Sequence, residues 1–390
     1  MKKFLTFLLV LLSSSLLLTA CGKKSEEGST EGAESAAPAA EGPILIGVAG
    51  AHSGDLASYG LPTANAAKLY VEEVNKRGGI NGRLVQLVIE DDACKPELAT
   101  NTANKLVSSK VVGVVGHICS GATKAALGIY ADAKIPVVSP SATSPELTQS
   151  GEYPNFFRTI APDDAQARLE AEFALDKLNV KKFAILHDKG DYGKGITDFV
   201  KAMLEERKAD GVEVVLYEGI TPGAVDYSAV VQKIGRSGAE AVIFGGYHPE
   251  ASKIVPQLRR RQITAPFISN DGVKEENFIR VAGEFAEGVY ATGPKDTSNN
   301  DLYAKVTEEH KNAFQADPGS FYYNGYAAVV VLLNAIEKAG STDYTAVTNA
   351  LKTEYVETPL GNISFDAKGD AIGVGFSIYQ VQNGTFVEIQ

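Results

Sequence analysis

The sequence predicts an α/β fold with two domains, each built on a doubly wound parallel β-sheet. Apolar runs rich in Val and Ile alternate with amphipathic helical runs, which is typical of parallel sheets covered by helices on both faces. These runs form two successive series, and a chain of 390 residues is long enough for about two domains. The composition, 44% apolar and 22% charged, is that of a globular protein.

Each expected strand is a short apolar run that leads into a helical stretch. The first series of strands covers residues 44–50, 84–90, 111–115 and 135–139, and the second covers 182–188, 213–219, 241–246, 265–269 and 288–293. The helices between them cover 63–77, 98–109, 165–178, 193–208 and 251–261. Beyond Pro294 the chain is more helical, at 302–314, 325–338 and 345–353, and it ends in strand-like segments around Ile363 and at 376–381. We expect the two series to join near residues 159–162.

The N-terminus has the pattern of a secretory signal. The apolar run from Phe4 to Ala20 follows two lysines, and it is short for a membrane-spanning helix. Residues 18–22 read LTACG and resemble the bacterial lipobox, in which the signal is cut before the Cys and its sulfur receives a diacylglycerol. We therefore expect a signal peptide at 1–20, a lipid on Cys21 and a flexible tether at 21–43. The alternative is an ordinary signal peptide with an incidental Cys.

Two further cysteines, Cys94 and Cys119, remain if Cys21 is lipidated. An even number in an oxidising compartment predicts that they form a disulfide, and the alternative is two unpaired buried thiols. Cys119 with nearby His117 could instead be read as a nucleophile, but a disulfide would remove the thiolate.

Charge and motifs argue against several classes of function. The net charge of −11, without a basic stripe, argues against nucleic-acid binding. The chain has no HExxH, GxSxG or P-loop motif, and its five His show no metal-ligand spacing. We expect no catalytic residue, no metal and no cofactor.

Two loops beyond expected strand ends carry polar groups suited to a small ligand. Ser120, in the loop 116–123, is expected at or beside a helix N-terminus, which suits a carboxylate. The alternative is that Ser120 only caps the helix. The loop 139–146 is dense in hydroxyls between two prolines, so it could bind an anion and offer carbonyls to an ammonium. A turn followed by helix capping is the alternative.

Five segments together resemble the periplasmic leucine/isoleucine/valine-binding proteins, the type I solute receptors of branched-chain amino-acid ABC importers. The segments read HDKGDYGKG (187–195), FGGYHPE (244–250), DDACKPE (91–97), GHICSGAT (116–123) and SPSATSPEL (139–147). The resemblance covers essentially all of 44–390. It implies a periplasmic binding protein fold of type I, with the ligand in the cleft between two hinged lobes and the disulfide Cys94–Cys119. We expect lobe 1 at 44–161 with 293–371, and lobe 2 at 162–292 with 372–390.

The resemblance also implies roles for individual residues. In the family, the ligand carboxylate meets residues matching Ser120 and Thr143, and a backbone carbonyl matching Ser141 accepts from the ammonium. The ligand-binding residues that we expect are Tyr59, Ile118, Ser120, Ser141, Ala142, Thr143, Tyr192, Tyr247, Asp271 and Phe321. Tyr192 and Tyr247 would close over the ligand. Tyr59, Ile118, Tyr247 and Phe321 would form an apolar wall that favours an aliphatic or aromatic side chain and discriminates modestly among Leu, Ile and Val.

Asp271 departs from the pattern, because close relatives carry Glu where this chain has Asp. The acid is expected to pair with the ligand ammonium, so a side chain one methylene shorter implies tighter lobe closure or a bridging water. The alternative is a solvated loop acid. An acid that did not reach the ammonium would put the ligand class in doubt.

The function implied is capture of an aliphatic, branched-chain L-amino acid and its delivery to an ABC importer. The expected partners are the amino acid and the permease subunits, and the expected form is a monomer held by its lipid to a bacterial membrane, in the periplasm or at the cell surface. The alternatives are a sensor that reports the ligand to a signalling partner and a receptor of the same fold for urea or a short amide.

Overall fold

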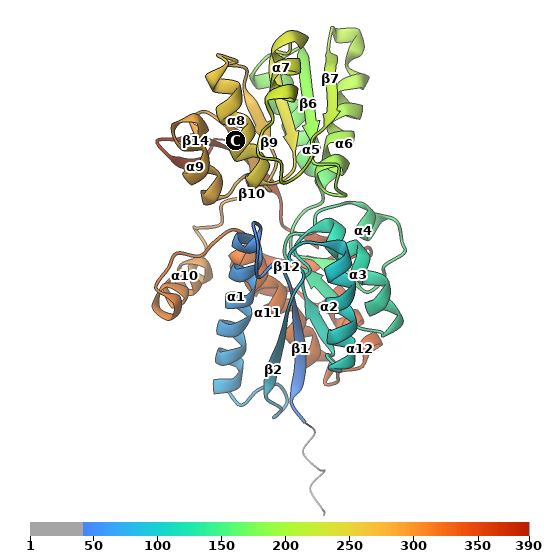
Figure 1. Cartoon of the computed structure of the whole chain (residues 1–390). Helices are drawn as coiled ribbons and strands as arrows, with labels where there is room; N and C mark the ends of the chain where they lie inside the picture. The colour runs from blue at the N-terminus through green and yellow to red at the C-terminus, as the bar shows by residue number, and fades with distance from the viewer. Residues whose placement is uncertain (1–41, 390) are drawn as a thin grey trace, which may run out of the picture. The chain divides into compact units, whose positions relative to one another are not determined.

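The computed structural model describes residues 42–389. These residues form two α/β units, each with its own β-sheet covered by helices (Figure 1). The expected signal peptide, Cys21 and nearly all of the tether lie outside the described residues. Between residues 42 and 389, no helix combines the length and the apolar character needed to cross a membrane.

The first sheet has five strands, all parallel, in the order β2-β1-β3-β4-β5. Its strands are β1 (Ile44–Gly50), β2 (Val85–Asp91), β3 (Gly113–Val115), β4 (Val137–Ser139) and β5 (Phe156–Arg158). Helices α1 (Ala57–Lys76), α11 (Tyr322–Ala339) and α12 (Tyr344–Thr353) pack on one face, and α2 (Pro96–Ser108) and α3 (Ser120–Asp132) on the other. Both faces are therefore apolar, as a parallel sheet requires.

The second sheet has seven strands in the order β15-β14-β10-β9-β8-β6-β7. They are β6 (Lys182–His187), β7 (Glu213–Gly219), β8 (Ala241–Gly245), β9 (Phe267–Ser269), β10 (Tyr290–Pro294), β14 (Phe376–Gln382) and β15 (Thr385–Glu388). The helices α5 (Asp163–Glu172) and α6 (Gly193–Glu206) cover one face, and α7 (Ser228–Ser237), α8 (His248–Arg260) and α9 (Glu276–Ala282) cover the other. The order β7-β6-β8-β9-β10 repeats the strand order of the first sheet.

In both sheets the strand order reverses beside the first strand, between β1 and β3 and between β6 and β8. Ligands of open α/β sheets bind at such a point, outside the carboxyl ends of the strands. The chain leaves the first sheet after β5, packs α11 and α12 against that sheet after β10, and enters the second sheet again at β14.

The second sheet is parallel from β7 to β10, as expected, and it carries two further antiparallel strands at one edge. β14 runs antiparallel to β10, and β15 runs antiparallel to β14. The turn between β14 and β15 consists of Asn383 and Gly384, both with positive φ, which is the geometry of a two-residue type I′ hairpin. The Asn-Gly pair was the available sequence signal for this hairpin.

Element boundaries differ from the expectation by a few residues at most sites. α1 begins at Ala57 rather than 63, because Pro62 lies inside the helix instead of marking its start. The helix expected at 165–178 is α5 followed by a π-helical turn, Phe173–Lys177. The remaining elements are α4 (Glu146–Gln149), α10 (Asp301–Phe314), 3₁₀ turns at Lys208–Asp210 and Gly283–Ala286, and a small antiparallel sheet of β11 (Val356–Thr358), β12 (Gly361–Phe365) and β13 (Ala371–Ile372).

Candidate ligand-binding site

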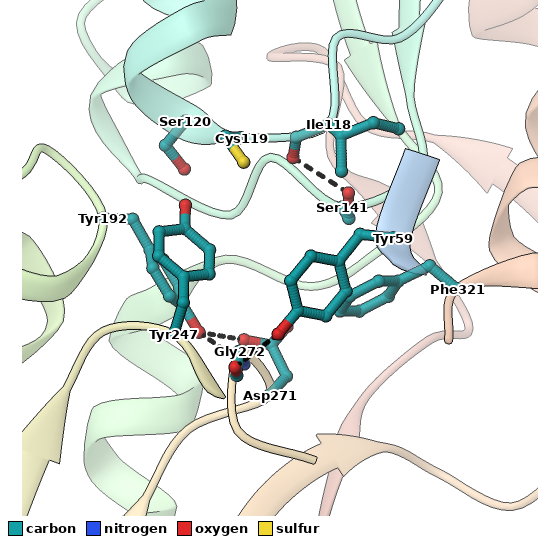
Figure 2. Close-up of a pocket in the computed structure, with 10 residues that line it drawn as sticks. All are labelled: Tyr59, Ile118, Cys119, Ser120, Ser141, Tyr192, Tyr247, Asp271, Gly272 and Phe321. Carbon is teal, nitrogen blue, oxygen red and sulfur yellow. Dashed lines mark hydrogen bonds between the residues drawn. The ribbon is translucent and has the colours of Figure 1, made fainter. Parts of the chain in front are cut away.

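A small cavity lies between residues carried by the two sheets (Figure 2). Its lining combines hydroxyls, one carboxylate and a set of aromatic rings: Tyr59, Ile118, Cys119, Ser120, Ser141, Tyr192, Tyr247, Asp271, Gly272 and Phe321. Most follow the carboxyl end of a strand, as open α/β sheets predict.

Ser120 is the first residue of α3, and its hydroxyl points into the cavity. Cys119 occupies the N-cap position and makes no side-chain capping bond. The Ser120 hydroxyl instead accepts a hydrogen bond of 3.2 Å from the N–H of Ser144, in the neighbouring loop. The reading of Ser120 as the helix cap is therefore wrong, and its hydroxyl connects the two loops at this wall of the cavity.

The loop after β4 is held by its own hydroxyls. The Ser139 hydroxyl donates to the carbonyl of His117 and accepts from the N–H groups of Ser141 and Ala142. The Ser141 hydroxyl donates to the carbonyl of Ile118 over 2.9 Å. Thr143 is fully buried, and its hydroxyl has no hydrogen-bond partner among the described residues. Hydrogen bonds therefore connect Ser139 and Ser141 to the loop after β3, whereas the Thr143 hydroxyl is on the side of Asp163.

Asp271 lies opposite this loop, after β9, and it is buried rather than solvated. Its Oδ1 accepts a hydrogen bond from the Tyr192 hydroxyl, which also accepts from the N–H of Gly272 over 2.9 Å. Its Oδ2 is buried without a partner among the described residues. Burial raises the pKa of Asp271 to about 6. The reading of Asp271 as a solvated loop acid is wrong, because its side chain is buried at the cavity wall.

Gly272 allows Tyr192 to approach this carboxylate. A methyl group on Gly272 would lie 2.7 Å from the carbonyl oxygen of Gly246 and 2.9 Å from the Tyr192 ring. Any side chain at this position would push the tyrosine away from Asp271.

Aromatic rings form the rest of the wall. The Tyr59 ring centroid lies 6.0 Å from that of Tyr247 and 5.8 Å from that of Phe321, and Tyr192 lies 5.0 Å from Tyr247. The Tyr247 hydroxyl points toward Ser120, whereas the Tyr59 hydroxyl points away and bonds to Gly272 (Figure 2). With Ile118, these rings present an apolar surface.

Eight of the ten expected ligand residues line the cavity, and Ala142 and Thr143 do not. Both residues are fully buried, and they follow Ser141 directly in the sequence. The ligand role of all ten stays a prediction.

Sequence reasoning missed Asp163 and Gln166, near the start of α5. Both are fully buried. Asp163 Oδ1 accepts from Gln166 Nε2 over 3.0 Å, and Gln166 Oε1 accepts from the N–H of Asp271 over 3.1 Å. Burial raises the pKa of Asp163, and the Asp271 carboxylate raises it further. Asp163 Oδ2 has no partner among the described residues. An acid in the first turn of a helix is ordinary, so the sequence held no signal that separates Asp163 from Asp164.

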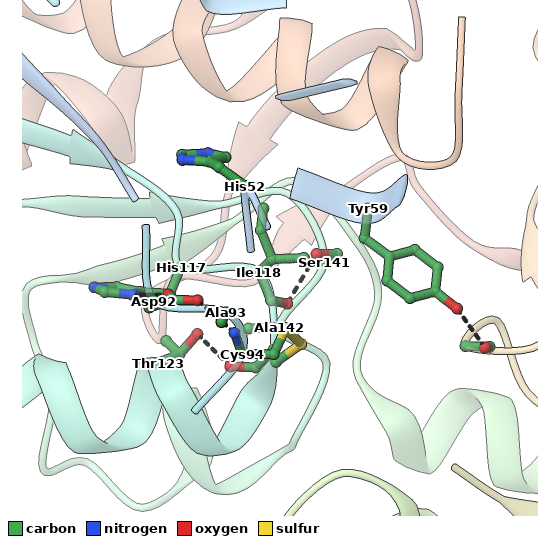
Figure 3. The surroundings of a disulfide bond; sticks show 12 residues. His52, Tyr59, Asp92, Ala93, Cys94, His117, Ile118, Thr123, Ser141 and Ala142 are labelled. Carbon is green, nitrogen blue, oxygen red and sulfur yellow. Dashed lines mark hydrogen bonds and ion pairs between the residues drawn. A yellow bond between two sulfur atoms is a disulfide. The ribbon is translucent and has the colours of Figure 1, made fainter. Parts of the chain in front are cut away.

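The predicted disulfide between Cys94 and Cys119 is present, beside the cavity (Figure 3). The Cα atoms are 5.4 Å apart. Asp92 accepts from the N–H of Cys94 over 2.7 Å, and its other oxygen bonds to the buried His117. The alternative of two unpaired thiols is wrong, and the Cys119 sulfur is not available as a nucleophile while the bond is intact.

Metal-ligating side chains do not gather in the described part of the chain: no group of three or more His, Cys, Asp or Glu is arranged to hold an ion.

Known proteins resemble this chain both in sequence and in fold. Residues 43–385 match the family model of periplasmic binding proteins. The chain is 38% identical over 337 residues to a leucine-, isoleucine-, valine-, threonine- and alanine-binding protein of Pseudomonas aeruginosa, covering 86% of this chain and 89% of that protein. It is 35% identical over 343 residues to the Leu/Ile/Val-binding protein of Escherichia coli K12, covering 88% and 92%.

Two solved structures extend the comparison to the fold. The leucine-binding protein LivK of Thermotoga maritima superposes with a TM-score of 0.81 at 26% identity, covering 89% of this chain and 98% of that one. The branched-chain amino acid transporter substrate-binding protein LivJ of Streptococcus pneumoniae, in complex with isoleucine, superposes with a TM-score of 0.79 at 30% identity, covering 89% and 100%.

Proposed function

The chain belongs to the family of periplasmic binding proteins that includes the Leu/Ile/Val-binding proteins, and we propose that it captures an aliphatic L-amino acid for delivery to an ABC importer. The observation that carries this proposal is Asp271: a buried carboxylate at the cavity wall with one oxygen unpartnered among the described residues. A buried carboxylate requires a cation, and an α-ammonium group supplies one.

The amino acid's ammonium group is the part that Asp271 would bind. Asp163 adds a second buried carboxylate oxygen without a partner among the described residues, coupled to Asp271 through Gln166. An ammonium donates three hydrogen bonds, so it can use both acids and still reach a backbone carbonyl such as that of Ser141. Two acids also compensate for the shorter side chain at position 271.

The opposite wall suits the carboxylate. Ser120 lies at the N-terminus of α3, where N–H groups and the helix dipole favour a negative charge. The Ser120 and Tyr247 hydroxyls face each other across the cavity. The ligand would therefore lie with its carboxylate toward the first sheet and its ammonium toward the second.

The apolar wall would hold the side chain. Tyr59, Ile118 and Phe321 bring no charge that could pair with an acidic or basic ligand. Such a wall separates ligands that differ by one methylene by only about 1–3 kcal/mol, so Leu, Ile and Val should compete. Since contacts come from elements of both sheets, binding would favour the closed arrangement of two lobes. We propose lobe 1 at 44–161 with 293–371 and lobe 2 at 162–292 with 372–390.

The remaining features of the proposal concern place and partners. The relatives are substrate-binding proteins, and we propose that this chain likewise binds and does not transform its ligand. We propose an extracytoplasmic monomer, tethered by a lipid on Cys21 and delivering the amino acid to membrane permease subunits. Mass spectrometry of Cys21 from bacterial membranes tests the lipid.

Thermal shift is the direct test of the ligand class. Residues 22–390 would be unfolded, refolded to remove bound ligand, and titrated with each of the twenty L-amino acids, leucinamide, urea and acetamide. A ligand at about 1,000 times its Kd adds roughly 4 kcal/mol of stability. Stabilisation by Leu, Ile and Val, but not by Asp or Lys, is expected. Asp271→Asn should lose this response, whereas Asp317→Asn, at an exposed ion pair, should keep it.

Other outcomes contradict the proposal. Stabilisation by urea or acetamide alone would make the chain a receptor for a small amide. If the permease subunits fail to bind the loaded protein and a signalling protein binds it instead, delivery to an importer is excluded.

A further inference from the structure

We propose that Arg158 is a positioning residue that aims the backbone N–H of Thr143 at the ligand carboxylate. This inference rests on the amino-acid binding proposed above, and it assigns a role to a side chain outside the cavity. Arg158 is the largest fully buried side chain of the described residues, at the end of β5.

The Arg158 guanidinium is clamped to the loop behind the cavity. Its Nη1 donates to the carbonyl oxygens of Ala142 and Ser144, over 3.1 and 2.8 Å. Its Nη2 donates to the Thr148 hydroxyl over 2.6 Å, and its Nε donates to Asp370 Oδ1 over 2.6 Å. The planar fork of arginine is suited to hold several acceptors at fixed angles, which lysine cannot do.

This clamp determines which way the Thr143 N–H points. In a trans peptide the C=O and the next N–H point in opposite directions, and the bond between Ala142 and Thr143 is trans. The Ala142 carbonyl points at Arg158, so the Thr143 N–H points away from it. The Ser120 hydroxyl lies next to this loop, since it accepts from the N–H of Ser144. The Thr143 N–H is thereby held on the face of the loop opposite Arg158, and we infer that the ligand carboxylate binds on that face.

The hydrogen bonds of the loop leave this N–H unused. The N–H groups of Ser141 and Ala142 donate to Ser139, and that of Ser144 donates to Ser120. The Thr143 carbonyl accepts from the N–H of Asp163 over 2.9 Å. Within the described part of the chain, the Thr143 N–H has no acceptor, although Thr143 is fully buried. A buried N–H without a partner is costly, so a site that keeps one implies that a ligand supplies the acceptor.

The charge of Arg158 strengthens the same donor. A guanidinium bonded to the Ala142 carbonyl polarises that peptide and makes its N–H a better donor to an anion. The counter-ion, Asp370, binds Nε, whereas the loop carbonyls bind Nη1. Arg158 therefore favours a carboxylate over a neutral group of the same shape.

The test compares L-leucine with L-leucinamide, in which a neutral amide replaces the carboxylate and the ammonium is kept. Isothermal titration would give both Kd values for the wild-type chain, for Arg158→Lys and for the matched control Arg168→Lys, an exposed arginine on α5. In Arg158→Lys the preference for leucine over leucinamide should fall at least tenfold, with the Kd of leucinamide changed less than threefold. The ¹H–¹⁵N resonance of Thr143 should shift downfield on leucine binding in the wild type and less in the variant.

If Arg158 only stabilises the fold, we expect a different result. If Arg158→Lys weakens both ligands equally, or changes neither, the positioning role is overturned. If Arg158→Lys gives no cooperative melting, Thr148→Val replaces it, with Thr148→Ser as the control that keeps the hydroxyl. Loss of the Nη2 acceptor in Thr148→Val should weaken leucine binding more than leucinamide binding. An equal loss for both ligands overturns the proposal. A wild-type chain that binds neither compound contradicts the proposed function itself.

Discussion

The Tyr59 hydroxyl donates a hydrogen bond of 2.6 Å to the carbonyl oxygen of Gly272, 213 positions away in the sequence. Tyr59 belongs to α1, beside the first sheet, and Gly272 follows β9 of the second sheet. The bond thus joins residues carried by the two sheets, and it borders the cavity next to Asp271. In the hinge closure proposed above, this bond forms only when the two lobes close, so we assign it to the ligand-retaining state.

Tyr59→Phe should weaken leucine binding by about fivefold, because a buried hydrogen bond contributes about 1 kcal/mol. The loss should lie in a faster dissociation rate, since the bond forms only after closure. Stopped-flow measurement of both rates checks this. Tyr355→Phe, at an exposed ring, is the matched control and should change neither rate. A slower association with unchanged dissociation would contradict the assignment of this bond to the closed state.

Leucine affinity should fall in acid. The ligand ammonium binds ionised Asp271, whose pKa burial raises to about 6 in the ligand-free protein. Affinity should therefore be constant above about pH 7 and decrease, up to tenfold per pH unit, as the pH falls below 6. Burial also raises the pKa of Asp163. Protonation of Asp163 should therefore lower the leucine affinity in acid as well. Titration calorimetry from pH 5 to pH 8 checks this.

Asp271→Asn serves as the control for that titration, because its weak residual binding should lose most of the slope. A full slope in this variant would assign the titration to another group. His248 is one such group, since burial lowers its pKa to about 4, and closure on a protonated histidine would also be unfavourable in acid.

The same substitution should stabilise the ligand-free protein. The pKa of Asp271 is raised in the folded state, so its favourable contribution is present only below the unfolded pKa, near 4, and is lost as the pH rises through 6. At pH 7.5 the buried carboxylate is therefore destabilising, by at most about 3 kcal/mol. Asp271→Asn should raise the Tm without ligand while it abolishes the response to leucine. Asp317→Asn should leave both unchanged, and a lower Tm for Asp271→Asn would refute this reading.

Removal of the disulfide should lower both stability and affinity. Cys94 and Cys119 are 25 positions apart, and closing a loop of that length contributes about 3 kcal/mol in the chain-entropy model. The double variant Cys94→Ser/Cys119→Ser should melt several degrees lower by calorimetry. Because Cys119 is the N-cap residue directly before Ser120, leucine affinity should fall as well. Unchanged affinity in a destabilised variant would show that Ser120 is held by the Ser144 loop alone.

The strands of both sheets could be located from the sequence, because buried parallel strands are apolar on both faces. Ile46 and Val48 of β1 and Val242 and Phe244 of β8 are fully buried, as their apolar runs predict. Short strands were harder: β5 is only three residues long, and its last residue is Arg158. A fully buried arginine contradicts the usual apolar pattern, so the strand carried no recognisable signal.

Within the candidate site, family likeness identified the residues that face the cavity and missed those that support them. Loop residues such as Ser120 and Tyr247 follow strand ends, where position along the chain already indicates the ligand side. Gln166 and Arg158 make hydrogen bonds to residues up to 212 positions away, and Asp163 is bonded to Gln166. No local sequence pattern indicates such distant partners.

The sequence by itself determined the fold class, the disulfide partners and the apolar character of the site, because each depends on residue type and local spacing. Only the tertiary structure decided that Asp271 is buried with one oxygen unpartnered among the described residues, that Asp163 lies in the same network, and that Arg158 binds carbonyls of the loop that contains Thr143. These properties depend on desolvation and on hydrogen-bond direction. Both arise when segments distant in the chain pack together, and neither is a property of any segment alone.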